Sequence, residues 1–308
     1  MNLIDQLLAI LQKHPAISLI LIVFVVFYPT ARHTVHYASS LTHALHGKLV
    51  LLHVKRASLF DPYELMAESF RQEELSRETE TAAALYRMAG ELPTQPTVEV
   101  ATDLLPVMTQ DLATRHRPAL FVLSQPHRTR AGDSVAHDCA ELLRAGHFPL
   151  LVVPPTAPID QPPRRILIAA DREPFALASN AHALHQLLAL PGAELIVAHI
   201  SSGVEDDEGC SSALRAVQLS GLIKGLAMPE LRGYEHDSYA KGLLAAVQDT
   251  QADLVIVLAR ERSYLSELFH QSVTARLLAE CPVPVLVLPV ATEVASAPSA
   301  SRSTAAAR

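Results

Sequence analysis

Short apolar runs alternate with longer stretches of helical pattern along most of this chain, and that alternation limits the fold more than any other feature. An uninterrupted apolar run is typical of a strand that is buried on both faces, as in a parallel sheet covered by helices. The first set of runs covers 17–27, 48–54, 96–102, 119–124 and 149–155, and the second covers 164–171, 193–200, 230–237, 252–259 and 284–290. We therefore predict an α/β fold with two tandem, doubly wound, parallel five-stranded sheets.

The two sets of runs are similar, which indicates a duplicated domain. LVLLHV in the first set matches LIVAHI in the second, and PLLVVP matches PVLVLP. A repeat of roughly 140 residues is much longer than the units of solenoid proteins. We expect a first domain with a short helical lead over residues 1–156, a second domain over 163–290, and a disordered tail over 291–308. The last run of each set would be an exposed apolar edge, so the two domains are expected to pair through those strands as a pseudo-dimer.

The net charge indicates which partners to expect, and the cysteine content indicates the cellular compartment. The formal net charge is −7, whereas non-specific nucleic-acid binding needs a basic surface, so nucleic acid is not an expected partner. The three cysteines form neither a disulfide framework nor a CxxC zinc spacing, and they suit a reducing compartment. We expect a cytoplasmic protein.

One apolar stretch, 16–28 (AISLILIVFVVFY), resembles a short membrane anchor or the core of a signal peptide. It is shorter than the roughly 20 residues that a membrane-spanning helix needs. Its β-branched residues and the Pro-Thr that follows favour a buried strand, with a membrane or targeting segment as the alternative.

Several motifs follow each other in a characteristic order. ILIAAD ends at Asp171, ADLVIV begins at Ala252, QSVTARLLAE begins at Gln271, and CPVPVLVLP completes the series. This order resembles the universal stress protein family in its tandem form, over nearly all of residues 17–290. The resemblance implies a Rossmann-like fold and, in members that bind ATP, a glycine motif that holds the phosphates at a strand-to-helix turn, with the adenine end near the first-strand aspartate.

The glycine motif of the family is replaced in both halves. In the second half its three glycine positions fall on Leu258, Glu261 and Gln271, with Ser272 in the serine position. Glycine lets backbone N–H groups approach a phosphate, whereas the side chain of Leu258 would fill that space. Glu261 would repel a triphosphate, because like charges about 4 Å apart repel by roughly 4 kcal/mol at an effective dielectric constant near 20. In the first half Ser124 and His127 take the first two glycine positions, and Val26 replaces the aspartate. We predict a degenerate nucleotide loop in both halves.

Two arginines beside Glu261 raise one alternative for phosphate binding. Arg260 and Arg262 could clamp a phosphate with their side chains, with Asp171 and Ser272 completing the site. The simpler interpretation, which we favour, is a solvated loop in which an Arg-Glu pair contributes little. Asp171 would then cap a helix that begins near Pro174.

Catalytic and metal-binding patterns are missing from the sequence. It contains no GxSxG elbow, complete Walker loop, HExxH or CxxC motif, so no enzymatic activity and no metal site are expected. Histidines at 33, 36, 43 and 46 fall on one side of a predicted helix and are expected to face water. His53 and His199 lie in strands and are expected to be core residues with one satisfied nitrogen.

Three functional hypotheses follow from these observations. The first is a non-catalytic scaffold or regulator of the stress response, with no cofactor. The second is a sensor whose second domain alone binds ATP or another adenylate weakly. The third is a membrane protein anchored by residues 16–28. A homodimer is left open, because the duplicated chain could already bury the edges that single-domain relatives bury by dimerising.

Overall fold

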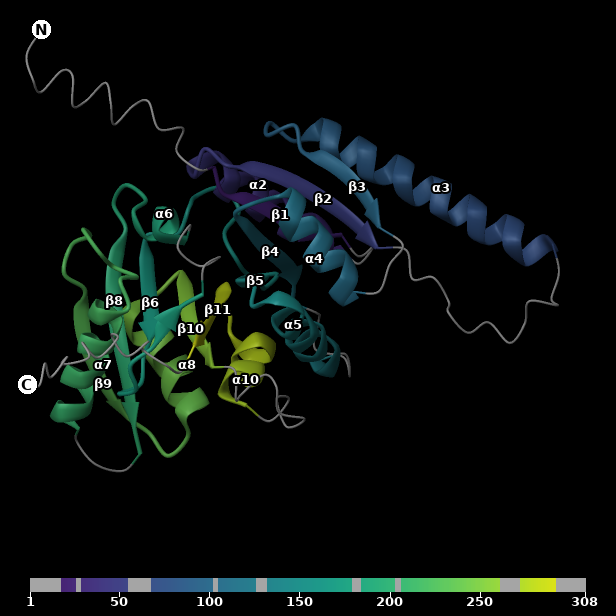
Figure 1. Ribbon diagram of the computed structural model, residues 1–308. Helices are drawn as coiled ribbons and strands as arrows, with labels where there is room; N and C mark the ends of the chain where they lie inside the picture. Colours follow the sequence, from purple (N-terminus) through teal and green to yellow (C-terminus); the bar gives the residue numbers. More distant parts are fainter. Residues whose placement is uncertain are drawn as a thin grey trace, which may run out of the picture.

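A mixed sheet of eleven strands runs through the molecule (Figure 1). The computed structural model describes residues 18–25, 29–54, 68–101, 105–125, 132–178, 184–202, 206–260 and 272–291. The strand order is β3-β2-β1-β4-β5-β11-β10-β6-β8-β9, and β7 pairs with β11 beside this path.

Five parallel strands form the first half of the sheet. They are β1 (Ile20–Phe24), β2 (Lys48–Val54), β3 (Thr97–Ala101), β4 (Ala119–Ser124) and β5 (Leu150–Val153). The central strands β1 and β4 are almost entirely buried, which explains why their sequences are apolar without alternation. The apolar stretch 16–28 therefore contains a strand, as predicted, and its described part lies between β2 and β4.

The second half repeats this order. Its strands are β6 (Arg165–Ala169), β7 (Ala176–Leu177), β8 (Glu194–Ser201), β9 (Glu230–Glu235), β10 (Leu254–Arg260) and β11 (Val285–Ala291). All of them except β7 pair in parallel with their neighbours in this half. The two-residue strand β7 pairs antiparallel with the end of β11 and has no counterpart among the predicted runs.

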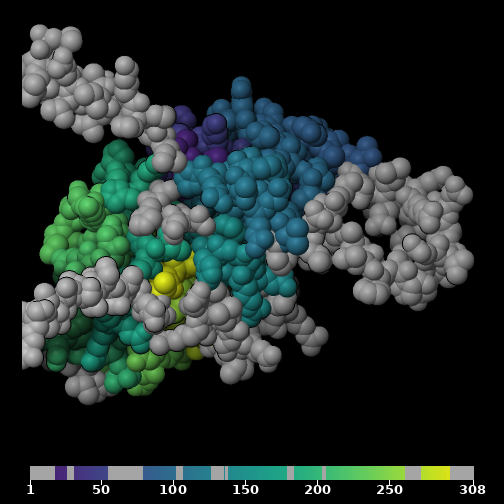
Figure 2. Space-filling view, in the orientation of Figure 1, coloured from purple at the N-terminus to yellow at the C-terminus, as the bar shows by residue number. Residues whose placement is uncertain are grey.

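The two sets of strands meet at their last members. β5 and β11 pair antiparallel, with Leu151 opposite Leu286. Figure 2 shows the yellow C-terminal residues between the blue and teal first half and the green second half. The pairing of these edge strands, which the sequence analysis expected, joins both sets of strands into a single sheet.

Helices cover both faces of the sheet and bury two apolar cores. On one face the core residues come from α2 (Pro29–Ala44), α3 (Glu68–Glu91), α6 (His185–Leu188) and α7 (Asp207–Leu219). On the other face they come from α4 (Leu105–Arg115), α5 (Gly132–Gly146), α8 (Tyr239–Thr250) and α10 (Val273–Glu280). Each core contains residues from both halves, so the packing is continuous across the junction of β5 and β11.

A buried polar contact also joins the halves. The side-chain amide of Gln125, just after β4, donates to the carbonyl oxygens of Leu278 and Cys281 at the end of α10, at 2.9 and 3.3 Å. These carbonyls have no partner within the helix, so the glutamine satisfies groups that the helix end leaves open.

No described helix has both the length and the apolar character that crossing a membrane requires. The predicted helical lead before residue 18 and the predicted tail after Ala291 lie outside the described residues.

Candidate functional site

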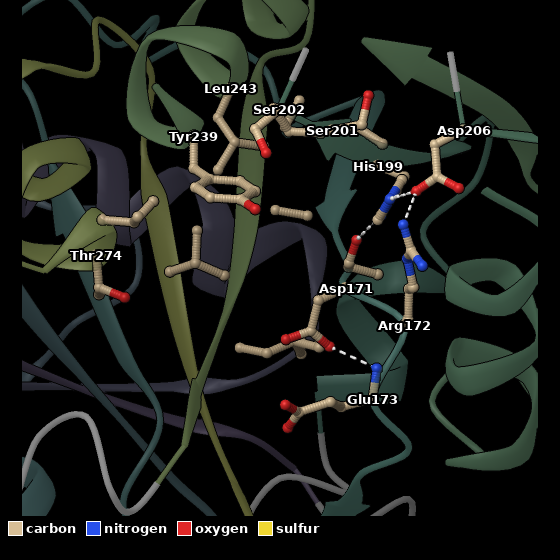
Figure 3. A pocket seen from close by; sticks show the side chains of 17 residues that line it. Asp171, Arg172, Glu173, His199, Ser201, Ser202, Asp206, Tyr239, Leu243 and Thr274 are labelled. Atoms are coloured by element: carbon tan, nitrogen blue, oxygen red, sulfur yellow. Dashed lines mark hydrogen bonds and ion pairs between the residues drawn. The ribbon is translucent and has the colours of Figure 1, made fainter. Parts of the chain in front are cut away.

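A cavity of about 770 Å³ opens at the carboxyl ends of the strands in the second half. Its walls come from the ends of β6 and β8, from β10, and from the first residues of α8 and α10 (Figure 3). Strands β6 and β10 are neighbours in the sheet, yet β6 connects onward to β8 on its other side. Such a switch in strand order is where open α/β sheets bind their ligands.

Arg260, the last residue of β10, binds Asp171 beside the cavity. Its Nε and Nη2 atoms donate to the two carboxylate oxygens of Asp171, at 3.3 and 2.5 Å. It also donates to the carbonyl oxygens of Glu173 and Pro174, at 2.9 and 3.3 Å. Arg260 is only 5% exposed. Four hydrogen bonds thus occupy most of the five N–H groups that a guanidinium carries.

Arg260 holds the segment that follows β6. This segment leaves β6, passes the end of β10, and pairs as β7 with β11, while Phe175 is buried in the core. The prediction of a helix near Pro174 capped by Asp171 is wrong, because residues 172–173 form a bend and Ala176–Leu177 form the strand β7. The Asp171 carboxylate instead accepts from the backbone N–H of Glu173 at 3.1 Å, in addition to Arg260.

A second charged cluster joins β8 to α7. His199 Nδ1 faces the carbonyl oxygen of Ala170 and its Nε2 faces Oδ2 of Asp206, both at 3.2 Å. Arg172 donates to the same Asp206 oxygen. Both ring nitrogens of His199 therefore have partners, in contrast to the single partner expected from the sequence. The ring is thus held between the end of β6 and the start of α7.

Asp206 is held in its ionised form. The backbone N–H of Gly209, in the first turn of α7, donates to Oδ1 of Asp206 at 2.9 Å. This hydrogen bond is the main cause that lowers the pKa of Asp206, with His199 and Arg172 lowering it further. Asp206 is also the N-cap of α7, so one carboxylate both begins the helix and anchors the cluster.

The remaining wall of the cavity is mainly apolar. Leu258, at the first glycine position of the motif, lines it together with Val257 and Leu243. The Ser272 hydroxyl accepts from the backbone N–H of Ala275 at 3.1 Å and is the N-cap of α10. Its side chain is therefore engaged in starting the helix.

The residue of the first half that is equivalent to Leu258 can be assigned from the strand register. Ser124 lies beside Val153 of β5, as Leu258 lies beside Leu288 of β11. Val153 and Leu288 are matching residues of the similar runs PLLVVP and PVLVLP, so Ser124 is the position equivalent to Leu258. The hydroxyl of Ser124 is buried and has no hydrogen-bond partner among the residues that the structure describes.

The structure brings Asp171 and Arg260 of the predicted site into contact, and Ser272 begins the helix that borders the same cavity. The described residues do not include several others that the sequence singled out, namely Val26, His127, Glu261, Arg262 and Gln271.

Comparison with protein families gives one match. Residues 233–289 match the model of the universal stress protein family. The second half of the chain is therefore similar to this family over that segment. The matched segment begins in β9 and ends in β11, so it contains β10, Arg260 and the start of α10. The wall of the cavity that carries Leu258 thus lies within the matched segment.

One solved structure shows the same fold, and two others are similar at lower TM-scores. A universal stress protein from Archaeoglobus fulgidus DSM 4304 matches with a TM-score of 0.59 at 12% identity, over 87% of this chain and 95% of that chain. A functionally unknown protein from Pseudomonas aeruginosa PAO1 matches with a TM-score of 0.47 at 15% identity, over 88% and 92% of the two chains. A universal stress protein in complex with cAMP matches with a TM-score of 0.28 at 15% identity, over 43% and 100%. None of the curated proteins has a sequence that matches this chain. Because the first of these likenesses extends over 87% of the chain, the universal stress protein fold spans both halves.

Sequence analysis missed the cluster of His199, Asp206 and Arg172. A signal for it was present, since Asp206 precedes a helical pattern as an N-cap would, and His199 stands near the end of a predicted strand. The carboxyl ends of neighbouring parallel strands meet at one edge, so these residues could have been grouped with Asp171.

Proposed function

We propose that this protein is a non-catalytic regulator of the stress response that acts through its surfaces, and that neither half binds a nucleoside triphosphate. The match of residues 233–289 to the universal stress protein family supports a role in the stress response. The observation that carries the rest of the proposal is the pairing of Asp171 with Arg260. Through this pairing the aspartate that would face an adenylate and the arginine that would face a phosphate neutralise each other.

The glycine motif supports the same proposal. Leu258 stands in the cavity wall where the motif has glycine. A leucine side chain keeps a phosphate away from the backbone N–H groups that would bind it. Glu261, at the second glycine position of the motif, is negatively charged like a triphosphate. Repulsion between these charges would weaken the binding of a triphosphate further.

The contacts of the charged cluster also support the proposal. A base must have a free lone pair within reach of the substrate. Both nitrogens of His199 already face oxygen atoms, and Asp206 accepts from Gly209, His199 and Arg172. These contacts support a non-enzymatic role, because the groups that could move a proton are engaged within the protein.

A sensor that binds ATP or another adenylate in its second half is the second candidate. The position of the cavity favours it, because the cavity lies at the switch in strand order and α10 begins at its wall. In this case Arg260 would have to leave Asp171, or Arg262 would have to supply the positive charge alone.

Calorimetric titration of the full chain with ATP separates the two candidates. We expect no saturable binding up to about 1 mM ATP, a dissociation constant that corresponds to a binding free energy near −4.1 kcal/mol. The variant Leu258→Gly, Glu261→Gly, Gln271→Gly should gain measurable affinity, because it restores the backbone approach. Saturable binding to the unchanged chain that is lost in Arg260→Ala, Arg262→Ala would overturn the proposal in favour of the sensor. Arg276→Ala, an exposed arginine on α10, is the matched control.

A further inference from the structure

Each charged side chain among the described residues that line the cavity has an oppositely charged partner. Asp171 pairs with Arg260, and Asp206 pairs with Arg172 and His199. Glu173 also reaches Arg260, whose Nε lies 3.4 Å from its Oε2. A charged ligand would have to displace one of these partners and leave a charge partly buried without compensation. An uncharged ligand requires no such exchange.

The opposite side of the cavity offers an apolar surface with hydroxyl groups. Figure 3 shows Tyr239, Leu243 and Thr274 on this side, across from the cluster of His199, Asp206 and Arg172. Tyr239 begins α8, and it is 50% exposed although it is a large aromatic residue. An aromatic ring that lines a cavity offers a flat surface on which another ring can stack.

We propose that this cavity binds an uncharged aromatic small molecule that carries one or two hydrogen-bonding groups. Its apolar body would lie against Leu243 and Leu258, its ring against Tyr239, and its polar group near the hydroxyl of Thr274. The volume of about 770 Å³ suits such a molecule, because small-molecule pockets commonly measure about 300–1,000 Å³. The assignment rests on the proposed function in one respect, namely that a triphosphate does not occupy the cavity.

A matched pair of fluorescent probes tests the proposal on the full chain. N-phenyl-1-naphthylamine is uncharged, and 8-anilino-1-naphthalenesulfonate has the same ring system with one added sulfonate. We expect saturable binding of the uncharged probe with one site per chain, and at least about tenfold weaker binding of the sulfonate, which corresponds to about 1.4 kcal/mol. The opposite order of affinity would overturn the proposal.

Two variants locate the bound probe. Val273→Glu adds a carboxylate to the cavity wall at the first residue of α10, where a negative charge is compatible with the helix dipole and folding should persist. Tyr239→Ala removes the ring. Each should weaken the uncharged probe at least about tenfold, with the far-UV circular dichroism unchanged. The control is Leu219→Glu, at a leucine that is 71% exposed at the end of α7, and it should leave the affinity unchanged.

The outcomes separate this inference from the proposed function. Absence of saturable probe binding, or equal binding by the unchanged chain and both cavity variants, overturns the inference whatever ATP does. Saturable ATP binding in a parallel titration overturns the proposed function instead. Loss of the probe in both cavity variants, without loss in Leu219→Glu, supports the inference.

Discussion

Replacing Arg260 with alanine removes the cation that joins the end of β10 to the segment after β6. Two backbone carbonyl oxygens, of Glu173 and Pro174, lose a donor, at a cost of about 1 kcal/mol each. Asp171 loses its ion pair, but its side chain is 54% exposed and regains water, so this contribution is about 1 kcal/mol instead of the 3–5 kcal/mol of a fully buried pair. We expect Arg260→Ala to lower the free energy of unfolding by about 3 kcal/mol.

Urea unfolding followed by far-UV circular dichroism measures this loss, because the chain has no tryptophan for fluorescence. The matched control is Arg276→Ala, at a 43% exposed arginine that pairs with Glu280 within α10, and it should cost less than about 0.5 kcal/mol. The double-mutant cycle of Arg260→Ala with Asp171→Ala should give a coupling energy of about 1 kcal/mol. A loss below about 0.5 kcal/mol for Arg260→Ala would refute the reasoning, since Arg260 would then be a solvated side chain.

Three further predictions concern protonation, thiol access and the junction of the halves. The lowered pKa of Asp206 adds stability that is fully present above the ordinary carboxyl pKa of 3.8 and is lost as the pH falls through the lowered pKa. The difference in urea midpoint between the unchanged chain and Asp206→Asn should therefore shrink as the pH falls below 3.8, and a constant difference would contradict this. Cys210 is only half-buried and should react with a thiol reagent in the native protein, although burial also raises the pKa of its thiol. Cys139 and Cys281 are fully buried, burial raises the pKa of both thiols, for Cys281 to about 11, and they should react only in urea; three equivalents of native reaction would contradict this. Gln125→Ala should lower the free energy of unfolding by about 1–2 kcal/mol, because two carbonyls of the other half lose their donor, and an unchanged urea midpoint would count against that contact.

The strands could be predicted because their signal is local. β10 and β11 are nearly uninterrupted apolar runs, and a strand buried on both faces requires that composition. The first-half strand β1 was separable from a membrane segment for the same reason, together with its length and β-branched residues. The prediction that Ser124 corresponds to Leu258 also agrees with the strand register.

The contacts at the candidate site could not be predicted, because they join residues far apart in the chain. Arg260 and Asp171 are separated by 89 positions, and no local sequence pattern predicts that their side chains form an ion pair. The segment with β7 was missed because a strand of two residues carries little local pattern, and its pairing with β11 decided the outcome. His199 could be placed in a strand, but its two partners come from the end of β6 and the start of α7.

The most direct measurement of the central claim is a crystal structure of the full chain grown with millimolar ATP. The account predicts that Arg260 stays on Asp171 and that the cavity beside Leu258 contains no adenylate. Electron density for an adenylate against Leu258, with Asp171 released from Arg260, would contradict it.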